Sequence, residues 1–211
     1  MASAAYKLIY FNVRARAEPI RLLFHAAGVP FDDKRIDSKE WPKMKPSIPG
    51  GRLPVLLVTK EGEKPKFYDE SMAIARLFAR KFNLLGNTDE EFYKIERLIG
   101  QCGDLDREMI NIFCADKERK SQLTEQFTEK FAPNIVKLIC QSLTESGGDF
   151  LLGSKLSFGD LYLMSTMDQV NVVAPHLLDE KCAPIQSNRD AVLRDRPNVQ
   201  TYLKGRPVSL L

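Results

Sequence analysis

The chain has 211 residues, of which 44% are hydrophobic and 28% are charged, and its formal net charge is +3. This is the composition of an ordinary globular protein, long enough for one large domain or two small ones, and it excludes disordered and collagen-like chains. Lysine and arginine alternate with aspartate and glutamate along most of the chain, which favours a mixed solvated surface over the basic stripe of a nucleic-acid-binding protein.

The first part of the chain alternates strand and helix patterns. We expect a strand at residues 7–10 and a helix over residues 16–27, where apolar residues recur at helical spacing. Pro19 suits the first turn of that helix, because its missing N–H costs little there, and Gly28 suits its end. A further strand is expected before residue 41.

A proline-rich loop covers residues 41–54. The apolar run at 55–58 predicts a strand, and the polar stretch that follows predicts a hairpin to a return strand at 66–69. Ser71 then opens a helix, whose inner face we expect to carry Ile74, Leu77, Phe78 and Phe82. The resulting order of elements fits one open α/β sheet.

The pattern becomes helical after residue 83. One long helix is predicted from a stripe of apolar side chains, namely Phe92, Ile95, Leu98, Ile99, Cys102, Leu105, Met109 and Phe113. A second helix carries apolar residues from Leu123 to Ile139, and we expect Pro133 to kink it. Ser157 and Asp160 have the spacing of a capping box, which predicts another helix start. We therefore predict an α/β domain at 1–83 and an all-α domain at 84–211.

Several classes of site are not expected. The four cysteines, Cys102, Cys114, Cys140 and Cys182, form no C-x-x-C pair, and with only two histidines the chain lacks the ligand spacing of a metal cluster. No stretch approaches the ~20 apolar residues of a membrane span, and residues 1–10 lack the pattern of a secretory signal. We therefore expect a cytoplasmic protein with reduced thiols, without metal, membrane or nucleic-acid partners.

Three places in the first domain carry candidate ligand-binding residues, and each also has an ordinary structural interpretation. Glu70 and Ser71 stand at a helix N-terminus, where Ser71 either caps its own helix or holds a ligand carboxylate while Glu70 pairs with an ammonium group. Trp41, with Lys45 four residues later, either plugs a core edge or binds a ligand. Tyr10 ends a strand, where a tyrosine is usually a core residue with its hydroxyl at the rim.

Taken together, these motifs resemble sigma-class glutathione transferases, most closely the flatworm branch. The resemblance covers nearly the whole chain and rests on five separated motifs. They are residues 10–21 (YFNVRARAEPIR), 41–46 (WPKMKP), 49–54 (PGGRLP), 70–76 (ESMAIAR) and 157–160 (SFGD). The resemblance implies a thioredoxin-like α/β domain followed by an all-α domain that contributes the pocket for the electrophile, with Leu53–Pro54 in the cis form.

The resemblance also implies the activity and the site. Glutathione would be a co-substrate, no cofactor would be needed, and the chain would form a homodimer that conjugates glutathione to hydrophobic electrophiles. Tyr10 would be the catalytic hydroxyl. The glutathione-binding residues would be Tyr10, Phe11, Arg16, Trp41, Lys45, Gly51, Arg52, Leu53, Pro54, Glu70, Ser71 and, from the partner subunit, Asp104.

One residue departs from the family pattern. The family usually has glycine where this chain has Ala15. If that position requires a positive φ, alanine strains it, and we expect a small local shift next to Arg16.

The chemistry expected of Tyr10 is modest. A free thiol has a pKa of about 8.5, and a hydrogen bond to the sulfur favours the nucleophilic thiolate. The thiolate would then attack an electrophilic carbon in an apolar pocket between the domains, which we expect Phe11, Val13 and the helix near Arg107 and Met109 to line.

Two alternatives stay open and one is excluded. Sigma-class relatives include glutathione-dependent prostaglandin D synthases, and crystallin-like relatives keep the fold but lose the activity. A thioredoxin-type disulfide reductase is excluded, because the first cysteine is Cys102, in the second domain.

Overall fold

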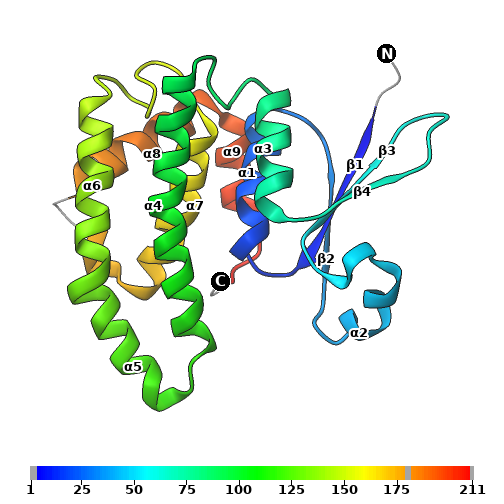
Figure 1. The fold of residues 1–211 in the computed structure, drawn as a ribbon, viewed down its shortest axis with the longest axis horizontal. Helices are drawn as coiled ribbons and strands as arrows, with labels where there is room; N and C mark the ends of the chain where they lie inside the picture. The colour runs from blue at the N-terminus through cyan, green and yellow to red at the C-terminus, as the bar shows by residue number, and fades with distance from the viewer. Residues whose placement is uncertain (1–3, 179–181, 210–211) are drawn as a thin grey trace. The chain divides into compact units, whose positions relative to one another are not determined.

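The computed structural model describes residues 4–178 and 182–209. The chain divides into two compact units (Figure 1), which we call unit 1 and unit 2. Unit 1 consists of two segments, Met1–Phe82 and Asn198–Leu211, and unit 2 is Asn83–Pro197. The sequence pattern had placed residues 198–211 with the helical domain, whereas the structure groups this last segment with unit 1.

Unit 1 is built on a mixed four-stranded sheet. Its strands are β1 (Ala5–Phe11), β2 (Asp32–Ile36), β3 (Val55–Thr59) and β4 (Lys66–Tyr68), in the order β2-β1-β3-β4. β1 pairs parallel with β2 and antiparallel with β3, which in turn pairs antiparallel with β4. β1, which carries Tyr10 near its end, is therefore one of the two inner strands, and the predicted α/β sheet is confirmed.

Alternate residues of β1 face two different layers. On one side α1 (Glu18–Ala26) packs against α3 (Ser71–Lys81), and the ring of Tyr6 meets Phe24 and Phe78 at centroid distances of 5.3 and 5.5 Å. On the other side Ile9 joins a buried cluster with Ile36, Ile48 and Val55. That cluster is covered by the loop that contains α2 (Trp41–Met44) and the short turns η2 (Lys45–Ser47) and η3 (Pro49–Gly51).

The last helix, α9 (Pro197–Gly205), and the residue after it are bonded to unit 1 at a buried carboxylate of α1. Glu18 of α1 is fully buried. It accepts hydrogen bonds from the Tyr202 hydroxyl at 2.9 Å and from Arg206 Nη1 at 2.6 Å. It also pairs with the fully buried Arg21 at 3.2 Å. A buried charge is stable only when it is paired, so this network holds the end of the chain on unit 1.

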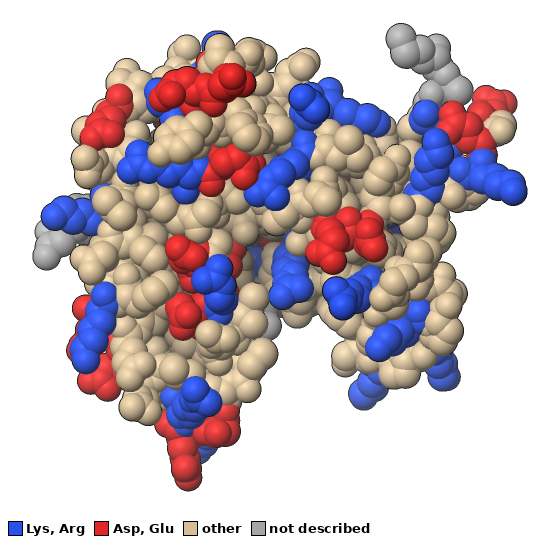
Figure 2. Space-filling view, in the orientation of Figure 1, with Lys and Arg blue, Asp and Glu red and all other residues tan. Residues whose placement is uncertain are grey.

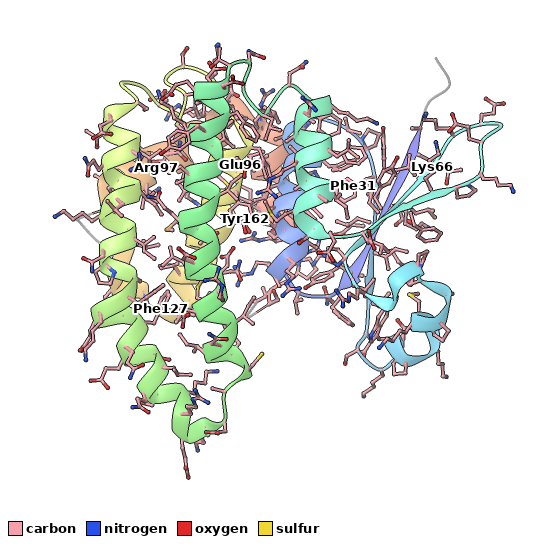
Figure 3. The ribbon with its side chains drawn as sticks, viewed as in Figure 1. Phe31, Lys66, Glu96, Arg97, Phe127 and Tyr162 are labelled. Carbon is pink, nitrogen blue, oxygen red and sulfur yellow. The ribbon has the colours of Figure 1, made fainter. Side chains whose placement is uncertain are left out.

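Unit 2 is helical, and its described residues contain no strand, only two isolated β-bridges near residues 150–155. Its helices are α4 (Asp89–Cys114), α5 (Lys117–Gln126), α6 (Ala132–Glu145), α7 (Phe158–Val173) and α8 (Ala183–Asp195), with the short turn η5 (Pro175–Leu178) between the last two. α7 is buried along most of its length and packs against α4 and α8. Tyr162 of α7 points toward α4 (Figure 3) and donates to Asp106 at 2.9 Å.

The predicted capping box at the start of α7 is present, and its carboxylate reaches further than the box. Asp160 is fully buried. It accepts from the N–H and the hydroxyl of Ser157 at 2.8 and 2.7 Å. It also accepts from the Leu151 N–H at 2.8 Å and from the Asn188 amide at 2.7 Å. One side chain thus joins the turn before α7, the loop at 151 and α8.

The predicted disturbance at Pro133 is present: within the continuous helical run at 117–145, the turn directly before the proline, η4 (Phe127–Phe131), is π-helical. Two side-chain predictions differ from the structure. Leu77 is exposed on α3 and Phe92 is exposed on α4, although both were expected on inner faces. Helical spacing defines an apolar stripe but cannot tell which edge of it stays uncovered.

The surface carries both signs of charge. Lysine, arginine, aspartate and glutamate are interspersed on the face shown in Figure 2. Within the ranges 4–178 and 182–209, none of the helices combines the length and the apolar character that crossing a bilayer requires.

Candidate active site

Tyr10 lies near the end of β1 on the α1 side of the sheet. Tyr10 is buried, and the Arg21 guanidinium lies 6.0 Å from the centroid of its ring. Burial raises the pKa of Tyr10 above its usual value, and the Arg16 backbone N–H and the charges of Arg16 and Arg21 only partly oppose this. The hydroxyl is therefore protonated at neutral pH and can donate a hydrogen bond.

The next residue, Phe11, points to the other face and connects β1 to the proline-rich loop. Its ring contacts Tyr10 at a centroid distance of 5.6 Å and Trp41 at 5.9 Å. Phe11, Trp41 and Leu53 all pack on the buried cluster beneath that loop. Trp41 therefore fills a core edge, which was one of its two interpretations, and this packing also fixes the start of the loop that carries Lys45.

The proline-rich loop folds back on itself at two glycines. Gly51 has φ = +57°, and a Cβ built there would lie 3.3 Å from Cε of Lys45, so the lysine stem runs directly over this glycine. A Cβ on Gly50 would lie 3.4 Å from an Asp69 carboxylate oxygen. These close approaches bring the loop next to the β4–α3 junction.

The β4–α3 junction carries Glu70 and Ser71. Glu70 has φ = +61°, and its carboxylate lies 3.8 Å from Arg52 Nη1 in an exposed pair. Ser71 is the first residue of α3, and among the residues that the structure describes no side chain caps this helix. The first-turn N–H groups of α3 therefore face outward beside Ser71, as an anion-binding helix end does. The alternative, in which Ser71 caps its own helix, is not what the structure shows.

The peptide bond between Leu53 and Pro54 is cis, as the resemblance implied. Most of the expected glutathione contacts lie on unit 1, in three segments: the end of β1, the loop before β3 and the start of α3. They are Tyr10, Phe11, Trp41, Lys45, Gly51, Arg52, Leu53, Pro54, Glu70 and Ser71. Arg16 is exposed beside Ala15, with its backbone N–H near the Tyr10 hydroxyl.

Two expected residues belong to unit 2. Asp104 lies on α4, where its half-exposed side chain pairs with Arg107 at 3.1 Å. Its reach to glutathione from a partner subunit stays a prediction. Met109, which we expected to line a pocket, is fully buried in the core of unit 2.

The sequence reasoning missed the charged layer behind Tyr10. Arg21 donates to Asp33 at 3.0 Å, and Arg35 donates to the same carboxylate at 2.8 Å. A local signal existed, because Glu18 and Arg21 lie three residues apart in an otherwise apolar helix. Nothing local marked Tyr202 or Arg206 as their partners.

Ala15 has φ = +34°, so the position does require the left-handed region that glycine adopts freely. We expect Ala15→Gly to stabilise the protein by about 0.5–1 kcal/mol, because the relief of about 1–2 kcal/mol of strain exceeds the entropy cost of a glycine. Urea unfolding measures the change. The control is Ala17→Gly, a buried residue with φ = −91°, which should destabilise. Equal effects of the two substitutions would contradict the assignment of strain to Ala15.

Comparisons with known proteins identify the family of the chain. A family model described as "Glutathione S-transferase, C-terminal domain" matches residues 103–206. The chain is 40% identical over 200 residues to the class-mu 28 kDa glutathione S-transferase of Schistosoma japonicum, covering 95% of this chain and 97% of that protein. The chain therefore belongs to the glutathione S-transferase family.

Two solved structures indicate which class of glutathione transferase the chain resembles. The sigma class enzyme of Fasciola hepatica superposes with a TM-score of 0.93 at 41% identity, over 99% of each chain. A prostaglandin synthase D of Nilaparvata lugens superposes with a TM-score of 0.84 at 30% identity, over 97% of this chain and all of that one. This chain is accordingly a glutathione transferase similar to the flatworm sigma class.

Proposed function

We propose that Tyr10 activates glutathione by donating its hydroxyl hydrogen bond to the sulfur. The observation that carries this proposal is the buried, protonated hydroxyl of Tyr10 near the end of β1. Most of the expected glutathione contacts belong to the same unit. The donor stabilises the thiolate, which then attacks an electrophilic carbon of a hydrophobic molecule. Tyr10 need not remove the proton, because it only has to favour the anion.

The other residues of unit 1 fit the shape of a tripeptide ligand. The outward N–H groups of α3, with Ser71, suit the carboxylate of the γ-glutamyl end, and Glu70 suits its ammonium group. Lys45, whose aliphatic stem runs over Gly51, carries an ammonium group that suits the carboxylate of the glycine end. The backbone of Leu53 suits the peptide groups of the cysteinyl part. We infer that no cofactor is needed, because the ligand itself brings the nucleophile.

A turnover assay tests this proposal against a binding-only role. The purified full chain is mixed with glutathione and chlorodinitrobenzene, and glutathione affinity is measured separately by calorimetry. We expect both binding and saturable conjugation. Binding without conjugation would favour a crystallin-like protein, and neither binding nor conjugation would refute the glutathione site.

Prostaglandin isomerisation is the second candidate. It is favoured by the likeness to the prostaglandin synthase D of Nilaparvata lugens. Such a reaction uses the same thiolate on a cyclic endoperoxide, so the two activities are compatible. Incubation with prostaglandin H2 and glutathione decides the point, because a product mixture identical to the spontaneous one would remove this candidate.

We further infer a cytoplasmic homodimer, in which Asp104 of the partner subunit reaches the γ-glutamyl end of glutathione. The position of Asp104 on the polar face of α4 supports this inference. Analytical ultracentrifugation that finds only monomers at micromolar concentration would refute it.

A further inference from the structure

Two cysteines of unit 2 lie together although they are distant in the sequence. Cys140 belongs to α6, Cys182 is the residue immediately before α8, and these two helices pack against each other. The Cys182 side chain and the backbone N–H of Ile185, in the first turn of α8, are the neighbouring groups that act on the Cys140 thiol. The sulfur atoms therefore need only a short approach to form a covalent bond.

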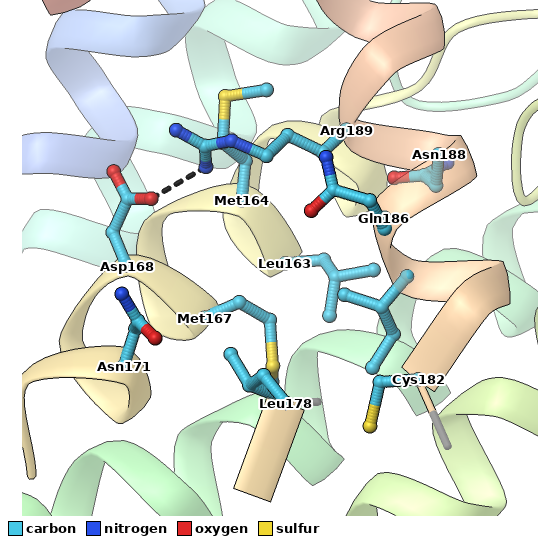
Figure 4. A pocket seen from close by; sticks show the side chains of 11 residues that line it. Leu163, Met164, Met167, Asp168, Asn171, Leu178, Cys182, Gln186, Asn188 and Arg189 are labelled. Atoms are coloured by element: carbon cyan, nitrogen blue, oxygen red, sulfur yellow. Dashed lines mark hydrogen bonds and ion pairs between the residues drawn. The ribbon is translucent and has the colours of Figure 1, made fainter. Parts of the chain in front are cut away.

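The surroundings of the pair differ on its two sides. Cys182 is almost buried and its thiol donates to the Leu177 carbonyl at 3.2 Å. It also lines a pocket of about 230 Å³ between α7 and α8 (Figure 4), where Met164 and Met167 supply apolar walls. Cys140 is half-buried on the α6 side. A small oxidant thus has access to the pair from the pocket or from the surface of α6.

The other two cysteines have no such neighbour. Cys102 is fully buried, and the side chains that act on its thiol are those of Asp106 and Thr166. Cys114 is exposed at the end of α4. Within the part of the chain that the structure describes, Cys140 with Cys182 is the one thiol pair in contact.

We propose that Cys140 and Cys182 form a reversible disulfide, which makes them a redox modification site that joins α6 to the start of α8. The oxidant is a hydroperoxide. One thiolate attacks the peroxide, the O–O bond breaks, and a sulfenic acid forms as an alcohol leaves. The second thiol attacks that sulfur, the S–S bond forms and water leaves. Two thiols and one hydroperoxide thus give a disulfide, an alcohol and water, with two electrons passing from sulfur to oxygen.

Oxidation of this pair is expected to be slow. Burial and, to a smaller extent, the neighbouring Cys182 side chain raise the pKa of Cys140 to about 11. Because the thiolate is the reactive form, the dithiol persists until oxidant is sustained. The disulfide would close a loop of about 40 residues, and cross-links of that size stabilise a fold chiefly by restricting the unfolded chain. This inference is independent of the proposed role of Tyr10.

The experiment oxidises the full-length Cys114→Ser variant, which removes the exposed thiol, with graded hydrogen peroxide. We expect loss of the mass of two hydrogen atoms, a Cys140–Cys182 cross-linked peptide in a non-reducing digest, and full reversal by dithiothreitol. Thermal unfolding should shift upward by about 5–10 °C in the oxidised protein.

Further variants in the same background keep the proposal falsifiable. Cys140→Ala and Cys182→Ala should each abolish the mass loss and the thermal shift, whereas Cys102→Ala should retain both. Oxidation of Cys140 to sulfinic acid without a cross-link would overturn the proposal. So would a loss of two hydrogens that persists in the Cys182→Ala variant.

Discussion

Tyr10→Phe is expected to slow glutathione conjugation about 10- to 100-fold at neutral pH while leaving glutathione affinity nearly unchanged. A hydrogen bond to a charged group contributes about 1.5–3 kcal/mol, which corresponds to one or two pKa units of the bound thiol. Without the donor, less thiolate is present and the rate falls in proportion. The backbone and the ring packing stay, because phenylalanine keeps the shape of the side chain.

The pH dependence makes this result diagnostic. The wild-type and Tyr10→Phe rates should converge as the pH rises past the raised thiol pKa of the variant, since both then hold mostly thiolate. The matched control is Tyr6→Phe, on the same strand, where the ring packs against Phe24 and Phe78. This control should keep the wild-type rate at every pH. A constant ratio between wild type and Tyr10→Phe across pH would show that Tyr10 acts otherwise than on the thiol pKa.

Asp160→Ala is expected to lower the free energy of unfolding by about 4–5 kcal/mol, a large share of a typical domain's stability. The substitution leaves three buried donors, the N–H and the hydroxyl of Ser157 and the N–H of Leu151, without this acceptor, and Asn188 keeps only its bond to the Asp149 carbonyl. Each such group costs about 1–3 kcal/mol. Asp160→Asn should rescue only part of the loss, because one carboxylate oxygen becomes a donor that faces other donors.

Urea unfolding of the full chain measures this effect, and the structure offers a matched control. Asp149 pairs with Arg194 at 3.1 Å, but both side chains are 64% exposed. Asp149→Ala should therefore change stability by less than about 1 kcal/mol, as exposed pairs do. Similar losses for the two substitutions would mean that the Asp160 network does not hold unit 2 together.

Local patterns predicted most of the elements but few of the long-range contacts. The strand at β1, the helix starts at Ser71 and Ser157, and the proline in the first turn of α1 all follow from spacing and capping chemistry. The capping box at 157–160 is local, so it was predictable. The further donors to Asp160 were not predictable, because Leu151 and Asn188 lie outside the repeat of any one helix.

The candidate site could be predicted to a similar depth. Tyr10, Trp41 and Ser71 each had a commoner structural interpretation, and only the family resemblance joined them into one site. The structure adds the physical links, such as the lysine stem over Gly51 and the Arg52–Glu70 pair. The role of Ala15 depended on its φ angle, which no sequence pattern determines. Asp104 depends on a second chain, which one sequence does not place.

The buried carboxylate of Glu18 determines which of the two units can finish folding first during synthesis. A chain leaves the ribosome from its N-terminus, and Glu18 is synthesised 188 residues before Arg206, one of its partners. Until that last segment emerges, Glu18 has Arg21 as a partner but lacks Tyr202 and Arg206. Unit 2 is complete earlier, because all of its residues precede position 198. The unit whose synthesis begins first is therefore completed last, and we expect a nascent chain to acquire glutathione binding only once the segment from Asn198 to Arg206 has emerged.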